Sequence, residues 1–377
     1  MTTIRSLIAL AAHRGWTISQ LDVNNAFLHG DLHEEVYMQV PQVIPNPEHQ
    51  VCRLRKSLYG LKQASRQWFQ KLSKTLVDLG YQQSKCDYSL FINKSSRHIT
   101  VVAIYVDDIL VTGSDSSKIQ HVKTRLDSLF GIKDLGRLNY FLGLEVVYLD
   151  DGIFLSQRKF TQELLVHSGF VDCTPAVTPL PLNCKLVPTE GTLLLDPTVY
   201  RTLIGKLNFL THTRPDLSFT VQALSQFMQS PRDSHLQALH HTLRYVKGTT
   251  DHGIVLKGSD QLRIQAYSDL DWAACLSTRR SVLGYVVLLG SSPISWRSKK
   301  QGTVSRSSSE AEYRAMAQTA SEVTWLVKLF GDLGVHSLKP VPLTITISQP
   351  FPLQKIQCFM SERNTSKFIV ISPEKRS

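Results

Sequence analysis

The 377-residue sequence contains no long apolar run and few cysteines. No stretch approaches the roughly 18 consecutive apolar residues that a membrane-spanning helix needs, so the sequence predicts no membrane partner. Its six cysteines are scattered, with no Cys-x-x-Cys pair and no Cys/His run at zinc spacing. This distribution argues against a zinc site and a disulfide framework, and favours reduced packing thiols in an intracellular protein.

Acidic residues are also under-represented. The chain has 31 of them against 42 lysines and arginines, which gives a formal net charge of +11. A basic excess favours a polyanionic partner, although basicity alone is weak evidence because many soluble proteins are basic without binding nucleic acid. The 42% hydrophobic content is typical of packed globular structure, and the length suits two or three domains.

The N-terminal residues are briefly apolar, and a signal peptide is one interpretation of them. A single basic residue ahead of the apolar run, Arg5, and apolar side chains spaced as Ile4, Leu7, Ile8 and Ala11 fit an amphipathic helix over residues 4–14 better. The sequence therefore predicts no signal peptide.

The most informative stretch is a pair of adjacent carboxylates, Asp107 and Asp108, between two runs of β-branched and aromatic residues. The density of Val, Ile, Tyr and Thr predicts two strands of a buried hairpin, with the Asp pair at or beside its tight turn. One interpretation is that the two aspartates are ordinary turn residues on a solvated hairpin. The other is a divalent cation, because adjacent buried carboxylates repel and ionise comfortably only beside positive charge.

A second carboxylate in a similar setting, Asp22 at the end of a short apolar run, favours the cation. Three strings then carry a family resemblance: Leu-Asp-Val-Asn-Asn-Ala-Phe-Leu-His-Gly from Leu21, Ser-Leu-Tyr-Gly-Leu-Lys-Gln-Ala from Ser57, and Tyr-Val-Asp-Asp from Tyr105. Together they resemble the reverse transcriptase of Ty1/copia-type LTR retrotransposon Pol polyproteins. The resemblance covers nearly all of residues 1–345, in the family's order.

This resemblance implies an RNA-directed DNA polymerase that uses two metal ions. Asp22 and Asp107 would bind two Mg²⁺ ions, with Asp108 assisting and Mn²⁺ as an alternative ion. The implied partners are an RNA template, a DNA primer, dNTPs and the RNA/DNA hybrid. The implied location is a cytoplasmic particle or the nucleus. The family carries fingers sequence ahead of residue 1, so the chain is expected to be truncated there and its enzyme activity is uncertain.

Several other residues match the family's nucleotide- or template-binding motifs. Phe27 would oppose a ribose 2′-hydroxyl, with core packing as the alternative. Basic side chains after residue 50 would reach phosphates, and a glycine would let a base or sugar approach the backbone. For Arg53 and Lys56 a solvated charged surface is the alternative. The assigned residues are Phe27, Tyr59, Gly60, Lys62, Gln63, Arg66 and Tyr105.

A strand pattern from Leu262 and a helix pattern from Ser308 resemble the RNase H domain that follows the polymerase in these elements. Asp269 matches the first catalytic carboxylate, with Asp271 as the less favoured choice. Glu312 matches the second, and both would bind metal. The family's third carboxylate has no counterpart after Leu343.

The tail suggests a reason for the missing acid. Codons for the family-like Asp-Asn-Gln-Ser-Ala, read one nucleotide late, give Thr-Ile-Ser-Gln, which is Thr346 to Gln349. We therefore expect residues 346–377 to be an out-of-frame reading, and the RNase H activity to be absent. Sequencing the coding DNA tests this, because restoring one base should recover the family-like tail.

The expected fold is α/β (α+β) and multidomain. Residues 1–170 are expected to form a reverse transcriptase palm and primer-grip region with the fingers largely missing, 171–260 a linker and helical thumb/connection, and 261–345 an incomplete RNase H-like domain. The alternative function is a non-catalytic nucleic-acid-binding remnant of a decayed element. A basic binding protein unrelated to this family is the third possibility, and in it changing Asp107 would leave every function untouched.

Overall fold

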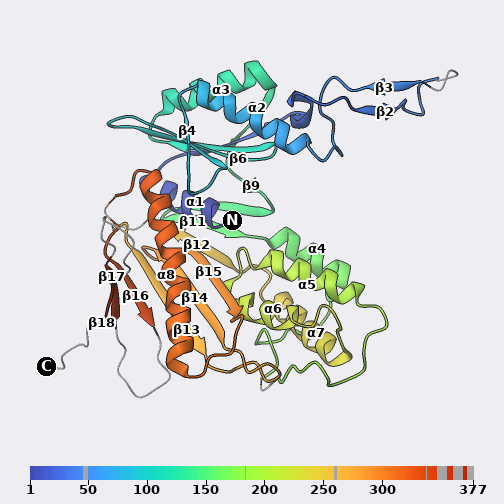
Figure 1. Cartoon of the computed structure of the whole chain (residues 1–377), viewed down its shortest axis with the longest axis vertical. Helices are drawn as coiled ribbons and strands as arrows, with labels where there is room; N and C mark the ends of the chain where they lie inside the picture. Colours follow the sequence, from blue (N-terminus) through green and yellow to red (C-terminus); the bar gives the residue numbers. More distant parts are fainter. Residues whose placement is uncertain are drawn as a thin grey trace. The chain divides into compact units, whose positions relative to one another are not determined.

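The structure is a computed structural model of the whole chain, and it describes residues 1–45, 50–182, 184–258, 261–336 and 338–345, with the backbone of 355–359 and 368–371. The chain forms two compact units (Figure 1). The first comprises residues 1–15, 139–328 and 335–377, and the second comprises residues 16–138 and 329–334. None of the described helices is both long and apolar enough to cross a membrane.

The second unit is one antiparallel sheet with two helices on it. The strands run in the order β4-β5-β6-β7-β1-β8, and a separate two-stranded ribbon is formed by β2 and β3. Its elements are β1 (Ile18–Val23), the 3₁₀ turn η1 (Ala26–His29), β2 (Tyr37–Gln39), β3 (Val51–Arg53), α2 (Ala64–Asp78), β4 (Gln82–Gln83), β5 (Leu90–Lys94), β6 (Ile99–Tyr105), β7 (Asp108–Gly113), α3 (Ser116–Phe130) and β8 (Ile132–Arg137).

Helices α2 and α3 form one core with this sheet. Trp68, Leu72 and Leu76 of α2 and Val122 and Leu126 of α3 pack with apolar side chains of β1, β6 and β7. Figure 1 shows the two helices lying side by side over the strands. Burial of this apolar surface is the main term that stabilises the unit and fixes the strand register.

The first unit is built from two further sheets and most of the helices. Its sheets run in the orders β12-β11-β10-β9 and β15-β14-β13-β16-β17-β18. Its elements are α1 (Thr2–Arg14), β9 (Tyr140–Phe141), β10 (Leu144–Leu149), β11 (Gly152–Ser156), α4 (Arg158–Ser168), α5 (Thr198–Leu210), η2 (Pro215–Leu217), α6 (Ser218–Ser225), α7 (Asp233–Gly248), β12 (Gly253–Lys257), β13 (Ile264–Asp271), β14 (Val282–Leu289), β15 (Ser292–Lys300), α8 (Ser308–Asp332), β16 (Val341–Ile345), β17 (Lys355–Phe359) and β18 (Phe368–Ile371).

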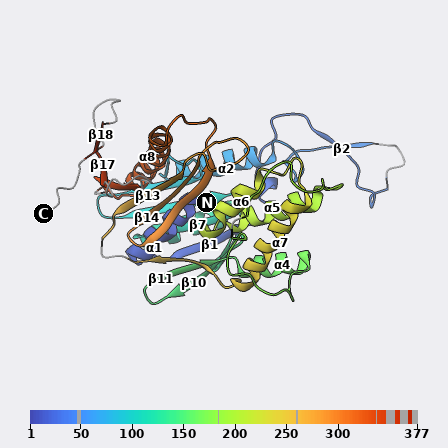
Figure 2. The same ribbon diagram turned by 90° about the horizontal axis from the view of Figure 1, so that it is seen from below.

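Helices α4 to α7 share a core of their own and lie together in both views (Figures 1 and 2). Tyr200 of α5 is fully buried in that core and donates its hydroxyl to the Leu224 carbonyl at 2.8 Å. Between α4 and α5 the described residues form neither helix nor strand.

The helix expected near the N-terminus is present as α1, but it is not amphipathic. Residues 3–11 are all buried, including Arg5 and Ser6. In the first unit α1 contacts β11, β12 and β15. The spacing of the apolar residues predicted one buried face, whereas these strands bury the helix on more than one side.

The mixed α/β class is confirmed, with several sheets among the described residues. The predicted boundaries 1–170, 171–260 and 261–345 stay predictions. The expected out-of-frame tail, 346–377, lies outside the described residues apart from the backbones of β17 and β18, which pair with β16 and with each other.

Candidate active site

Asp22, Asp107 and Asp108 are brought together by the pairing of β1 with β7. In that antiparallel register Asp22 lies directly opposite Asp108. The backbone N–H of Val23 donates to the Asp107 carbonyl at 3.0 Å, which ties the end of β1 to the hairpin turn. The sequence prediction of a hairpin with the Asp pair at its turn is therefore confirmed.

The turn itself is strained and held from α2. Tyr105 pairs with Asp108 across the hairpin, and Val106 between them has φ of 59°. A β-branched residue at positive φ is unfavourable and persists only where its surroundings hold it. The indole Nε1 of Trp68, which is buried, donates to the Val106 carbonyl at 2.7 Å. The helix therefore holds the turn that carries Asp107.

Asp108 is half-buried at the start of β7. Burial raises its pKa, a hydrogen bond from Gln20 Nε2 at 3.4 Å opposes that shift, and the nearby charges of Asp107 and Asp22 raise the pKa further. Among the described lysines, arginines and histidines, none forms an ion pair with any of the three aspartates. The site thus concentrates negative charge that the described residues do not neutralise.

We predict that Asp108→Asn raises the melting temperature at pH 7. Because the pKa of Asp108 is higher in the folded chain than in the unfolded one, ionisation above the usual Asp pKa costs folding free energy, and asparagine avoids that cost. The advantage should shrink as the pH falls towards about 3.9, where the unfolded carboxyl also takes up its proton. Differential scanning calorimetry between pH 3.5 and 7 measures it. A melting temperature below that of the wild type at pH 7 would contradict this account.

Phe27 and Tyr59 form an aromatic pair beside these acids. Their ring centroids are 4.4 Å apart with planes tilted by 44°. The pKa of Tyr59 is raised by partial burial and by the charges of Asp107 and Asp22, which places its phenol near both carboxylates. Phe27 sits on η1, which packs closely on α2 at Gly30, where an added Cβ would lie 3.1 Å from the Gln67 Cβ. Phe27 is partly buried and packs against the core of the second unit, which supports the alternative that it is a core-packing residue.

The basic residues before α2 divide into two groups. Arg53 pairs with Glu35 at 2.6 Å and Lys56 with Asp31 at 2.7 Å, which supports the surface-charge interpretation for both. Lys62 and Arg66 are exposed, and no carboxylate of the described chain pairs with either.

Three further residues were predicted to bind nucleotide or template, namely Gly60, Gln63 and Tyr105. Gln63 donates to Glu34 at 3.4 Å. Gly60 has φ of 96° with open space where a Cβ would be, so the backbone there is accessible. Tyr105 is 55% exposed at the start of the turn.

The second predicted group is split between a strand and a helix of the first unit. Asp269 and Asp271 lie on one face of β13 by strand alternation, and the pKa of Asp271 is raised by burial and by the Asp269 charge. Ser268, on the opposite face, accepts a hydrogen bond from Thr319 of α8 at 3.1 Å. Glu312 lies on α8, half-buried. Asp269 and Asp271 therefore lie next to each other on one face of β13. Helix α8, which carries Glu312, contacts the opposite face of that strand at Ser268.

Two residues that position the first site were missed as such by the sequence analysis. Gln20 lies two residues before Asp22 on the same face of β1, a signal that strand alternation could have revealed. Trp68 was not predicted to belong to the site, because nothing local in the sequence indicates its hydrogen bond to the Val106 carbonyl. In the described residues no three His, Cys, Asp or Glu side chains already surround a common metal position.

Comparison with known proteins agrees with these motifs. The family described as "Reverse transcriptase (RNA-dependent DNA polymerase)" matches residues 1–181. The retrovirus-related Pol polyprotein from transposon RE2 of Arabidopsis thaliana is 46% identical over 341 residues, which are 90% of this chain and 23% of that protein. The corresponding polyprotein from transposon TNT 1-94 of Nicotiana tabacum is 36% identical over 89% of this chain and 26% of its own length.

A shorter relative is aligned over its full length. A transposon Ty5-1 protein of Saccharomyces cerevisiae is 33% identical over 80% of this chain and 100% of its own. The chain thus spans about a quarter of the plant polyproteins and the whole of this yeast protein. A solved foamy viral protease-reverse transcriptase in complex with double-stranded DNA aligns with a TM-score of 0.21 at 12% identity, over 88% of this chain and 51% of that one. This TM-score is too low to establish a shared fold.

Proposed function

The chain belongs to the Pol polyproteins of Ty1/copia-type LTR retrotransposons and carries their reverse transcriptase domain, and from this we propose that it catalyses RNA-directed DNA synthesis at Asp22, Asp107 and Asp108. One observation carries the proposal: the β1–β7 register sets Asp22 opposite Asp108 beside a strained turn that presents Asp107. The described residues supply no cation for this charge, so a ligand has to supply it.

The three carboxylates fit a pair of divalent ions. Carboxylate oxygens are the ligands that Mg²⁺ prefers, with Mn²⁺ as an alternative. Because the described side chains do not yet surround one metal position, the carboxylates would have to turn towards the ions on binding. When bound, two such ions would lower the pKa of the primer 3′-hydroxyl and neutralise the leaving pyrophosphate.

The protein groups around the acids have separate roles in this proposal. Asp22 and Asp107 hold the ions, and Asp108 assists from a half-buried position fixed by Gln20. The Phe27–Tyr59 pair supports the sugar and base of the incoming dNTP, where the Phe27 ring opposes a 2′-hydroxyl. Lys62 and Arg66, which are free of described ion pairs, contact phosphates of the RNA template and DNA primer and make binding sensitive to salt.

RNA-templated primer extension tests this function. The purified chain, given a DNA primer annealed to an RNA template, dNTPs and Mg²⁺, should extend the primer, and chelation of Mg²⁺ should stop it. A folded chain that binds the primer–template but extends nothing, with Mg²⁺ or Mn²⁺, would contradict the proposal. That result would favour the alternative function, a non-catalytic nucleic-acid-binding remnant.

We propose separately that the chain does not cleave the RNA of an RNA/DNA hybrid. Asp269 and Glu312 match two RNase H carboxylates, but the sequence that follows β16, from Thr346, has no acid at the place where the family has its third. Two carboxylates hold a metal pair poorly. A labelled hybrid incubated with the chain and Mg²⁺ should stay intact, and specific cleavage that Glu312→Gln abolishes would refute this.

A further inference from the structure

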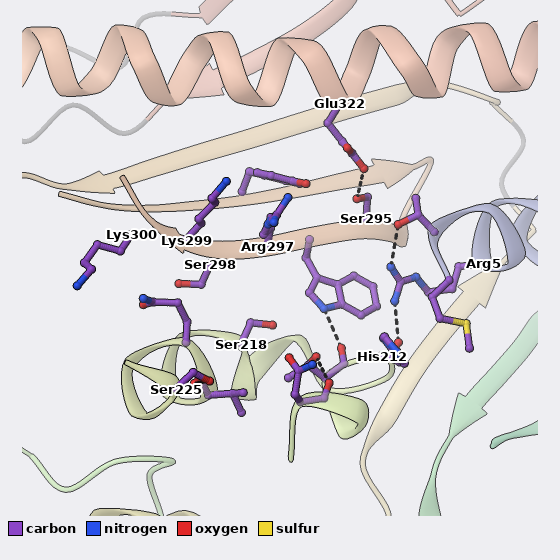
Figure 3. A pocket seen from close by; sticks show the side chains of 18 of the residues that line it. Arg5, His212, Ser218, Ser225, Ser295, Arg297, Ser298, Lys299, Lys300 and Glu322 are labelled. Carbon is purple, nitrogen blue, oxygen red and sulfur yellow. Dashed lines mark hydrogen bonds between the residues drawn. The ribbon is translucent and has the colours of Figure 1, made fainter. Parts of the chain in front are cut away.

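Strand β15 is at one end of its sheet, and its outer edge faces a cavity in the first unit. Six consecutive residues of the strand, 295–300, line this cavity, which has a volume of about 850 Å³. Because neighbouring side chains of a strand point to opposite faces of its sheet, a cavity that meets every residue in turn must reach around the strand edge. Helices α6 and α8 form its two walls, and Figure 3 shows Ser218 and Ser225 on one side of β15 and Glu322 on the other.

The first part of this edge is already covered. The Ile294 carbonyl accepts a hydrogen bond from Arg5 Nε of α1 at 2.9 Å. The Ser292 hydroxyl accepts one from the Lys257 N–H of β12 at 2.8 Å. In the remaining part, residues 296–300, no backbone group outside the sheet forms a hydrogen bond with the strand backbone among the described residues. Since every second residue of an antiparallel edge strand points its N–H and C=O outwards, this part is an open template for another strand.

Along this open part, the side chains on the face towards α8 are cationic. Arg297 and Lys299 share the face of Ser295. The Ser295 hydroxyl donates to Glu322 of α8 at 2.6 Å, so this carboxylate is held at the covered end of the strand. Both cations are exposed, and neither forms an ion pair with a carboxylate in the described ranges. The positive charge of this face is therefore available to an anionic group.

On the opposite face of the open part, the polar side chains at both ends are already paired. The indole N–H of Trp296 donates to the Thr211 carbonyl at 3.0 Å. The Lys300 ammonium donates to the side chain of Gln226, which follows α6. Ser298 lies between these two strand residues on the same face. The cation of this face is thus occupied, whereas the two cations of the α8 face are not.

From this arrangement we propose that residues 296–300 of β15 bind an acidic, extended segment of another protein as an added strand, with carboxylates two residues apart facing Arg297 and Lys299. In strand addition the main-chain hydrogen bonds provide affinity, and alternate side chains provide specificity. A residue directly opposite a cation lies on the same face, where an opposite charge stabilises the pair and a like charge destabilises it. A second copy of β15 would bring cations against cations, so the edge favours an acidic partner over self-pairing. The proposal does not depend on polymerase activity.

Binding of a short peptide to the full chain tests the charge pattern. The probe is a fluorescein-labelled peptide of sequence Thr-Val-Glu-Val-Glu-Val-Thr, whose binding is followed by fluorescence anisotropy. A second peptide of the same composition, Thr-Val-Val-Glu-Glu-Val-Thr, directs its two glutamates to opposite faces. It should bind at least about threefold more weakly, because one of the two charge pairs is lost. Equal affinity of the two peptides would overturn the proposal.

Charge reversal on the strand should reverse the preference. R297E/K299E should bind the first peptide about tenfold more weakly than the wild type does. It should also bind a peptide with lysines in place of both glutamates more tightly than the wild type does, a gain that misfolding cannot produce. The control R263E/R306E makes the same change in net charge at two exposed arginines of the same unit that do not line the cavity, and it should keep the wild-type preference. Equal effects of the two double variants would contradict the proposal, because binding would then depend on net charge alone.

Backbone pairing needs its own test, because only every second N–H of an added strand points at its neighbour. Two further versions of the first peptide are N-methylated, one on both glutamates and the other on two of the valines. One of them should bind on the order of tenfold more weakly, since its methyl groups replace the N–H donors that face β15. The other should bind as the unmethylated peptide does. Equal effects of the two methylations would rule out an added strand.

Hydrogen exchange followed by mass spectrometry locates the bound peptide on the chain. The first peptide should slow amide exchange in the fragment that contains residues 296–300, because the outward N–H groups of the strand gain acceptors. Exchange in α7 of the same unit should stay unchanged. Binding without slower exchange in residues 296–300 would contradict the location.

A second copy of the chain is the competing occupant of this edge, and sedimentation velocity tests it. The first peptide should leave the oligomeric state of the chain unchanged. A dimer that this peptide dissociates would show that two copies pair at the edge of β15, and the proposal of an acidic partner would then be wrong.

Discussion

We expect Asp107→Asn to reduce RNA-templated primer extension by about 10³-fold or more. The substitution keeps the shape of the side chain but removes a charged ligand, and several kcal/mol of charge stabilisation at the reacting phosphate depend on the metals that such ligands hold. It should leave the fold intact, because the bond from Val23 N–H uses the backbone carbonyl of residue 107 and not its side chain. Single-turnover extension under saturating dNTP measures the effect.

The matched control for this substitution is Asp127→Asn. Asp127 is exposed on α3 in the same unit, and no hydrogen bond or ion pair of its side chain is seen among the described residues. Its variant should extend the primer at the wild-type rate. If Asp107→Asn retained more than about a tenth of wild-type activity while its melting curve was unchanged, Asp107 would not be a metal ligand.

We expect Arg5→Leu to lower the free energy of unfolding of the first unit by about 3 to 5 kcal/mol. Arg5 is 4% exposed, and its guanidinium donates to the Ile294 carbonyl at 2.9 Å and to the His212 carbonyl at 2.8 Å. Burial lowers its pKa to about 10, so the group stays charged at pH 7. Leucine fills much of the volume but leaves the buried Ile294 carbonyl and the partly buried His212 carbonyl without this donor.

Urea unfolding followed by tryptophan fluorescence measures this loss, because Trp296 contacts the Arg5 guanidinium directly. Arg14→Leu is the control, since Arg14 is exposed in the last turn of the same helix. It should change the free energy of unfolding by less than about 0.5 kcal/mol. A similar small change in Arg5→Leu would show that the buried guanidinium does not stabilise α1 in its unit.

Local patterns predicted local structure well. The run of β-branched residues around Asp107 predicted the hairpin that the structure contains. Helix α3 begins after Asp115, whose side chain accepts a hydrogen bond from the Lys118 N–H at 2.9 Å, and ends at Gly131, which has φ of 62°. These features depend on backbone preferences and short-range hydrogen bonds, which a sequence displays directly.

Tertiary relations were harder to predict. The sequence indicated that Asp22 and Asp107 belong together only through a family resemblance, because strand order and register depend on packing far along the chain. Arg5 was interpreted as part of an amphipathic helix, yet two of its hydrogen-bond partners, the Ile294 and His212 carbonyls, are more than 200 residues away. The acid partners of Arg53 and Lys56 were also not predicted, since exposed ion pairs follow from loop geometry.

If the three aspartates of the second unit form a divalent-cation site, they should bind Mn²⁺, and this binding can be measured without any catalytic step. Electron paramagnetic resonance of free Mn²⁺, titrated with the full chain bound to primer–template and a dNTP, should show bound ions in wild type and in Asp127→Asn. Asp107→Asn and Asp22→Asn should lose most of that binding. Equal Mn²⁺ binding by all four proteins would contradict the claim.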